Sequence, residues 1–166
     1  IAEEIGNKRF VAARHINLGH ITYLQGELDV ASAELNKAMR ICDEIGDEYA
    51  KHVVLYVQAT IAFQRGDLGV AERQAEVARE FLENAGNPRV AAYAVEFLGR
   101  IQYYRGDITT ARNHLERASA WRAEANETFT KGRSDLMLAM FDLEEGRFDD
   151  AQAKATRLVE IFHKQN

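Results

Sequence analysis

The apolar residues of this chain recur at helical spacing, and the whole pattern repeats every forty residues. In the stretch 28–45 they stand three or four positions apart, and the stretches 68–85 and 108–125 repeat that register. Such spacing places apolar side chains along one face of a helix. The β-branched run 53–57 on its own could be a strand, but its place in the repeat favours a helix there too.

Glycine and asparagine punctuate the pattern in two series that alternate every twenty residues. One series is Gly26, Gly66, Gly106 and Gly146, and the other is Gly6, Gly46, Gly86, Asn126 and Asn166. Many helices end in a left-handed residue, a conformation that glycine adopts freely and asparagine tolerates. Each series position therefore predicts a helix end.

The residues that follow these positions can begin the next helix. Asp47, Asp67, Asn87 and Asp107 carry side chains that accept from the free N–H groups of a first turn. Pro88 follows Asn87 at the first helical position, where its missing N–H costs nothing.

The punctuation predicts eight helices of roughly 16–18 residues in four antiparallel pairs. The predicted repeats are 7–46, 47–86, 87–126 and 127–166, which form a single array over residues 1–166. Residues 1–6 match 41–46 and so predict the end of a preceding helix, in a chain cut from a longer protein. Stacked pairs of this kind share one continuous core.

Two Arg-Gly-Asp triplets, at 65–67 and 105–107, match a tripeptide that cell-adhesion ligands display. Both fall where the first helix of a pair ends. The glycine is then the C-terminal cap, the aspartate begins the next helix, and the arginine complements the helix dipole. We interpret both triplets as helix punctuation and not as adhesion loops.

The residues around these turns resemble the tetratricopeptide repeat. That family has Leu-Gly in the first helix, Gly and an acid at the turn, and two alanines seven apart in the second. The matches are Leu18-Gly19, Gly26-Glu27, Ala31 and Ala38, and later Leu98-Gly99, Gly106-Asp107, Ala111 and Ala118. The second repeat departs at Gln58, where the pattern has leucine, and the fourth has Leu158 for the last alanine.

The resemblance implies an all-α fold, a right-handed α-solenoid of four antiparallel helix pairs. The forty-residue period is similar to the arrays of MalT-like bacterial regulators and of the peptide-sensing regulators of Gram-positive bacteria. It thus implies a protein- or peptide-binding scaffold or sensory module, within a larger regulatory or signalling protein. The alternative is a structural array that self-associates through its ends and has no groove ligand.

Charge and composition narrow the classes of partner. The formal charge of −5 argues against nucleic acid, and no apolar run reaches the length of a membrane span. One cysteine, Cys42, fits a reducing cytoplasm and a buried core position better than a nucleophile. His15 and His20 are five apart, unlike a zinc pair on one helix face. We expect no metal, no cofactor and no enzyme activity.

The family binds partners along a concave groove lined by the first helices. Its stripe lies two, six, ten and thirteen residues before the turn glycine, and it carries different chemistry in each repeat. The candidate contact residues are Ile16, His20, Tyr56, Thr60, Tyr93, Glu96, Arg100, Tyr104, Arg133 and Met140. The remaining stripe positions are Ala13, Leu24, Val53, Gln64, Leu136 and Glu144. This mostly apolar stripe favours an amphipathic helix or an extended peptide as partner.

Overall fold

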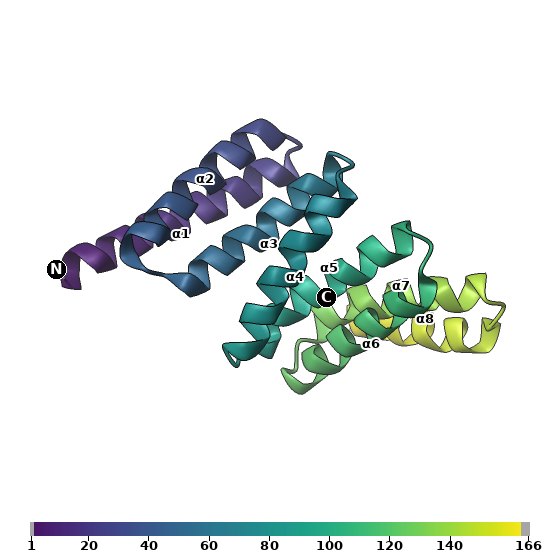
Figure 1. The fold of residues 1–166 in the computed structure, drawn as a ribbon. Helices are drawn as coiled ribbons and strands as arrows, with labels where there is room; N and C mark the ends of the chain where they lie inside the picture. The colour runs from purple at the N-terminus through teal and green to yellow at the C-terminus, as the bar shows by residue number, and fades with distance from the viewer. Residues whose placement is uncertain (1, 164–166) are drawn as a thin grey trace. The chain divides into compact units, whose positions relative to one another are not determined.

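The chain is an all-α protein built from helices joined by turns of two or three residues (Figure 1). The structure, a computed structural model, describes residues 2–163, except for the side chains at positions 2, 3, 128, 129 and 162. This range holds no strand. The helices are α1 (Ala2–Leu24), α2 (Leu28–Ile45), α3 (Glu48–Gln64), α4 (Leu68–Asn84), α5 (Pro88–Tyr104), α6 (Ile108–Glu124), α7 (Thr128–Glu144) and α8 (Phe148–His163). The predicted all-α class is confirmed, as is a helix over the β-branched run 53–57, while the right-handed turn of the solenoid stays a prediction.

The turns form where the punctuation predicts them. Gly66 has φ of 85° and Asn126 has φ of 56°, so both adopt the left-handed conformation that ends a helix. At most of these turns the N–H of the residue after the turn position donates to a carbonyl of the preceding helix, as from Asp67 to the Ala62 carbonyl at 2.9 Å. Asn166, the last position of its series, lies outside the described residues.

The predicted caps also form. The Asp107 carboxylate accepts from the Thr110 N–H at 3.0 Å, and this hydrogen bond lowers the pKa of Asp107. Asp47, Asp67 and Asn87 each accept from the N–H three residues on. These side chains satisfy donors that a helix leaves open at its start.

Gly6 does not end a helix, which corrects one prediction. Helix α1 runs without a break from Ala2 to Leu24, and Gly6 is absent from the positive-φ positions. By contrast, Gly46 and Gly86 of the same series have φ of 66° and 70° and lie between two helices. Gly6 lies inside one continuous helix, where a glycine costs only about 1 kcal/mol relative to alanine.

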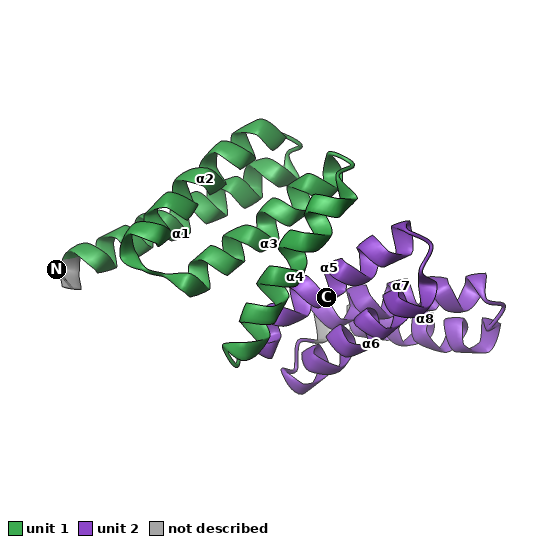
Figure 2. Ribbon diagram, viewed as in Figure 1, with its two compact units in different colours: residues 1–86 green, residues 87–166 purple. Residues whose placement is uncertain are grey.

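The helices group into two compact units, residues 1–86 and 87–166 (Figure 2). The division falls between Gly86 and Asn87, which is also a predicted repeat boundary. Within unit 1, α1 packs on α2, α2 on α3 and α3 on α4, and within unit 2 the same order holds from α5 to α8. The single array of four repeats stays a prediction.

The core of unit 1 lies where the paired helices approach closely. Leu35, Ala38 and Val54 are fully buried there. A Cβ placed on Gly19 would meet the Leu35 side chain at 2.8 Å, so this small residue sets how closely α1 and α2 pack. Cys42 is buried in the same unit, and burial raises the pKa of its thiol.

Unit 2 repeats this packing around Leu115 and Phe141. A Cβ on Gly99 would lie 3.1 Å from the Ala111 carbonyl and 3.2 Å from Leu115 Cγ. Gly19 and Gly99, the small residues of two first helices, are therefore close-contact positions. None of the described helices is both long and apolar enough to cross a membrane.

Candidate binding surfaces

The Arg-Gly-Asp turns are structural. At the first of them Arg65 pairs with Asp29 at 2.5 Å, while Asp67 caps α4. Gly66 and Gly106 both have positive φ and end their helices. The interpretation of both triplets as helix punctuation is confirmed.

The predicted stripe of the first helices is exposed at only some of its positions. The position two residues before the turn glycine is exposed in every repeat, as Leu24, Gln64, Tyr104 and Glu144. Ten residues before the glycine, Ile16 and Tyr56 are half-buried and Glu96 is buried. The depth of a stripe residue thus depends on whether its helix face meets a neighbouring helix.

In unit 1 most of the candidate contact residues pack inward. Ile16 and Tyr56 lie against the core, so truncating Tyr56 would also cost stability. Thr60 is buried, and its hydroxyl donates to the Val57 carbonyl at 2.7 Å, so it presents nothing to a partner. His20 remains exposed and stacks on Tyr23, with ring centroids 6.1 Å apart.

In unit 2 the candidate Glu96 is also buried, which removes it from any contact surface. Its carboxylate accepts from Arg122, from Ser134 at 2.9 Å and from Arg133 at 2.6 Å. Tyr93 is half-buried, and the Arg122 guanidinium lies 4.9 Å from the centre of its ring. These residues join α5, α6 and α7 through a buried polar network.

Arg122 is the centre of this network and was not among the predicted residues. Its side chain is completely buried, and Nη1 also donates to the Thr130 carbonyl at 3.1 Å. Its Nε and Nη2 atoms have no hydrogen-bond partner. The sequence alone could have pointed to Arg122, because it is a charged residue at a repeat position that is apolar elsewhere. Cys42 and Leu82 hold the equivalent core positions eighty and forty residues earlier.

The exposed part of the stripe in unit 2 lies on the two first helices α5 and α7. Glu96 of α5 contacts the first half of α7 through Arg133. Tyr103, near the end of α5, contacts the end of α7, where the Tyr103 hydroxyl donates to Glu144 at 2.9 Å. Tyr103 also stacks on Phe141, with ring centroids 5.1 Å apart. The two helices therefore run side by side in the same direction.

Three apolar side chains of the stripe on these helices reach solvent. Tyr104 is 65% exposed, Leu136 is 54% exposed and Met140 is 46% exposed. Arg133 is half-exposed beside them, and Arg100 lies over the Phe97 ring at 5.8 Å. We call Tyr104, Leu136 and Met140, with the two arginines, the first-helix face of unit 2.

A second cluster of charges surrounds Asp142 on α7. Its buried carboxylate accepts from Arg112 of α6 at 2.9 Å, from Arg147 at 2.5 Å and from Lys154 of α8. Burial alone would raise the pKa of Asp142, but these hydrogen bonds outweigh it and lower the pKa to about 2. The cluster ties three helices of unit 2 together.

In unit 1, Glu34 of α2 joins a smaller cluster. It accepts from Lys37 and from the His15 ring at 2.6 Å, and these bonds lower the pKa of Glu34. This hydrogen bond to Glu34 gives His15 a structural role. Among the described residues, no three His, Cys, Asp or Glu side chains come together as a metal site would require.

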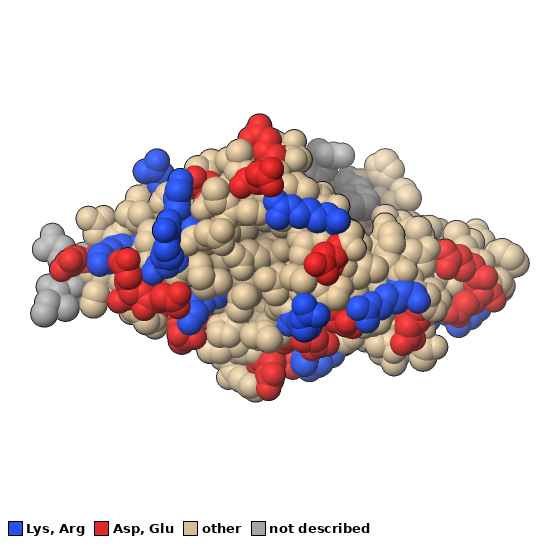
Figure 3. All heavy atoms as spheres, turned by 45° about the horizontal axis from the view of Figure 1, so that its top comes forward, with Lys and Arg blue, Asp and Glu red and all other residues tan. Residues whose placement is uncertain are grey.

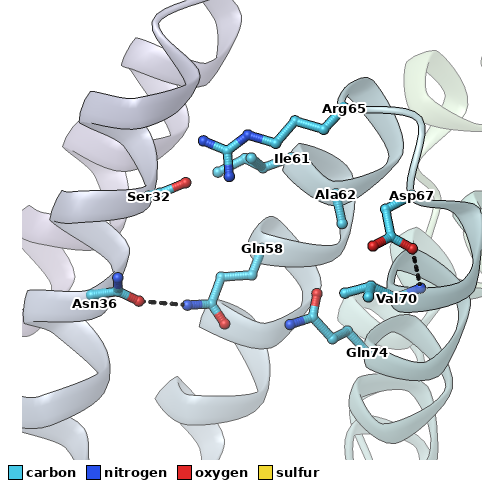
Figure 4. A pocket seen from close by; sticks show the side chains of 9 residues that line it. All are labelled: Ser32, Asn36, Gln58, Ile61, Ala62, Arg65, Asp67, Val70 and Gln74. Atoms are coloured by element: carbon cyan, nitrogen blue, oxygen red, sulfur yellow. Dashed lines mark hydrogen bonds between the residues drawn. The ribbon is translucent and has the colours of Figure 1, made fainter.

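A polar hollow lies between α2, α3 and α4 of unit 1 and has a volume of about 520 Å³ (Figure 4). The Gln58 amide extends from α3 toward Asn36 on α2, the Gln74 amide extends from α4 toward Gln58, and Arg65 reaches toward Ser32 on α2. Gln58 Nε2 donates to Asn36 Oδ1 at 3.1 Å. The Gln74 carbonyl oxygen is buried and has no hydrogen-bond partner.

Charges of both signs are interspersed over the face of the molecule drawn in Figure 3. No broad basic field appears on that face, although one would be expected of a surface that follows a phosphate backbone.

No family model and no curated protein matches the chain. Among solved structures it is similar to the crystal structure of BtubC (BKLC) from P. vanneervenii, with a TM-score of 0.78 and 22% sequence identity. The match covers 96% of this chain and 66% of that one, so this chain spans just under two thirds of BtubC. At this identity the likeness concerns the fold.

Proposed function

We propose that this chain is a protein-binding module of the tetratricopeptide-repeat type, without catalytic activity, whose contact surface includes the first-helix face of unit 2. The partner is an amphipathic helix that presents an apolar stripe and at least one acidic residue. The motif resemblance and the forty-residue period support the repeat type. The all-α fold, which BtubC shares, is compatible with it.

The observation that carries the proposal is the exposure of Tyr104, Leu136 and Met140 on two parallel, side-by-side helices. Aromatic and long apolar side chains of this kind anchor protein interfaces. The network around Glu96 fixes α5 and α7 beneath them, so the surface is already formed before a partner binds. Arg133, which is half-exposed beside these side chains, favours an acid in the partner.

This proposal predicts that binding depends on the first-helix face. A helical peptide selected from a displayed library against the chain should bind Tyr104→Ala and Met140→Ala at least about tenfold more weakly than wild type, as truncated anchors do. The melting temperature should barely change, since both positions are exposed. Calorimetric titration of the purified variants measures both effects.

Phe148→Ala provides the matched control, because Phe148 on α8 is a comparably exposed aromatic away from this face. It should bind like wild type. Peptides whose affinity depends on Phe148 and not on Tyr104 or Met140 would rule out the proposed surface.

A second candidate function is self-association through the ends of the helix array. Leu143 of α7 is 55% exposed, whereas Tyr103, forty residues earlier, stacks on the following repeat. Ile21 of α1 is 52% exposed, whereas its equivalent Ile61 is buried. Leu143 at one end and Ile21 at the other thus lack the neighbours that Tyr103 and Ile61 have at the equivalent positions. A head-to-tail contact between two copies would bury Leu143 of one copy and Ile21 of the other.

If the ends associate, the mean mass from light scattering should rise with protein concentration. Leu143→Lys or Ile21→Lys should each restore the monomer mass, while Val159→Lys on α8 should not. A mass that stays monomeric across the concentration range would exclude this candidate.

We place the module in the cytoplasm as the sensory or scaffolding part of a larger bacterial regulator. The similarity of the forty-residue period to MalT-like regulators supports this placement, and the single cysteine agrees with a reducing compartment.

A further inference from the structure

One polar residue interrupts an otherwise apolar position of the repeat. Leu98 and Leu138 occupy this position in unit 2, and both are buried. In unit 1 the position holds Leu18, which is 39% exposed, and Gln58, which is half-buried and faces the polar hollow. A leucine here would fill space between the helices, whereas Gln58 brings an amide to the wall of a hollow.

The equivalent place in unit 2 is filled. Eighty residues after Ser32, Ala62 and Gln74, the chain has Arg112, Asp142 and Lys154, and both cations pair with Asp142 across α6, α7 and α8. Ion pairs therefore join α6, α7 and α8 at the place in unit 2 that corresponds to the hollow of unit 1. Unit 1 instead carries the neutral residues Ser32, Ala62 and Gln74 at these three positions, which line a hollow of about 520 Å³.

The groups around the hollow are arranged to serve a ligand that both donates and accepts hydrogen bonds. Asn36, Gln58 and Gln74 carry N–H donors and carbonyl acceptors, as a peptide group does, and the one hydrogen bond from Gln58 to Asn36 uses only part of this capacity. The Gln74 oxygen is buried and has no partner, which is costly unless something donates to it. The charged groups are matched within the protein, because Arg65 pairs with Asp29 and Asp67 caps α4.

We propose that this hollow binds the main chain of an extended, uncharged peptide segment. The three amides would pair with successive peptide groups, and Ile61, Ala62 and Val70 line the remaining wall for small side chains. Its volume lies within the range of roughly 300–1,000 Å³ usual for ligand pockets. The lining, all of it among the described residues, contains no aromatic ring on which a sugar could stack.

This site is separate from the first-helix face. It lies in unit 1 and is formed by two second helices with the outer side of α3, whereas the first-helix face lies on α5 and α7. Either site can therefore exist without the other, and variants distinguish them.

The test uses ¹⁵N-labelled protein and an acetylated, amidated hexapeptide of alternating alanine and serine. Titration should shift the side-chain amide signals of Asn36, Gln58 and Gln74. Gln58→Leu should weaken binding at least about tenfold, because it removes a donor and an acceptor from a site built to use both. The variant should nevertheless melt at or above the wild-type temperature, since leucine is the residue that packs at this position in unit 2.

Gln152→Leu is the matched control, because Gln152 is an exposed glutamine on α8, and it should bind the hexapeptide like wild type. An analogue with ester groups in place of alternate amides should bind more weakly than the peptide. Three results would overturn the proposal: no shift at the three amides, equal binding by Gln58→Leu, or shifts with trehalose but not with the peptide. Peptide shifts confined to Tyr104 and Met140 would likewise exclude the hollow while supporting the first-helix face.

Discussion

Replacing Arg122 with alanine should lower the free energy of unfolding by about 3–5 kcal/mol, the usual cost of breaking a buried ion pair. Arg122 is completely buried and donates to Glu96, which is 2% exposed. After the substitution Ser134 and Arg133 still donate to the Glu96 carboxylate, but the buried cation that balances it is gone. Urea unfolding followed by fluorescence of Trp121, the one tryptophan, reports on this unit.

Two further variants decide whether the loss comes from removing the buried cation beside Glu96. Arg157→Ala removes an exposed arginine of α8 and should change stability by no more than about 0.5 kcal/mol. The double variant Glu96→Leu with Arg122→Leu removes both charges and should recover most of the loss. Leucine already occupies both equivalent positions, as Leu136 and Leu82. If Arg122→Ala were as stable as wild type, the network would contribute nothing to the fold.

The second large effect concerns Asp142 and acid. Its pKa of about 2 in the folded chain lies below its ordinary value of 3.8. The three cations therefore stabilise the charged form in the folded state. This contribution is fully present above about pH 4 and is lost as the pH falls toward 2. The shift corresponds to roughly 2 kcal/mol, which is a reasonable figure for a carboxylate only 1% exposed.

Asp142→Asn should thus be less stable than wild type by roughly 2 kcal/mol at pH 7, and the difference should shrink between pH 4 and pH 2. Urea midpoints measured across this range test the expectation. Asp149→Asn, an exposed carboxylate in the first turn of α8, should follow the wild-type profile closely. A constant gap between Asp142→Asn and wild type at every pH would show that the hydrogen-bond geometry matters and the charge does not.

Local chemistry is why the helix boundaries could be predicted. Left-handed φ at Gly66 and Asn126 and the caps at Asp47 and Asp107 depend on residues within a few positions of each other. The forty-residue period adds independent copies of the same signal. Gly6 shows the limit of that signal, because the same residue type there stays helical inside α1.

The depth of the contact residues could not be predicted in the same way. Thr60 and Glu96 lie on the predicted stripe of their own helices, but what covers them belongs to other helices. Spacing along one helix cannot show how far a neighbouring helix reaches. Comparison between repeats shows more, since Gln58 and Arg122 are polar where equivalent residues are apolar. One of them faces the hollow and the other anchors the buried network.

Cys42 gives unit 1 a chemical reporter that unit 2 lacks, because it is the chain's one cysteine. Its thiol is fully buried, and its raised pKa keeps it in the unreactive thiol form. A thiol-specific reagent can modify it only during excursions that expose α2. Under native conditions the modification rate therefore measures the free energy of those excursions in the first half of the chain, while Trp121 reports on the second.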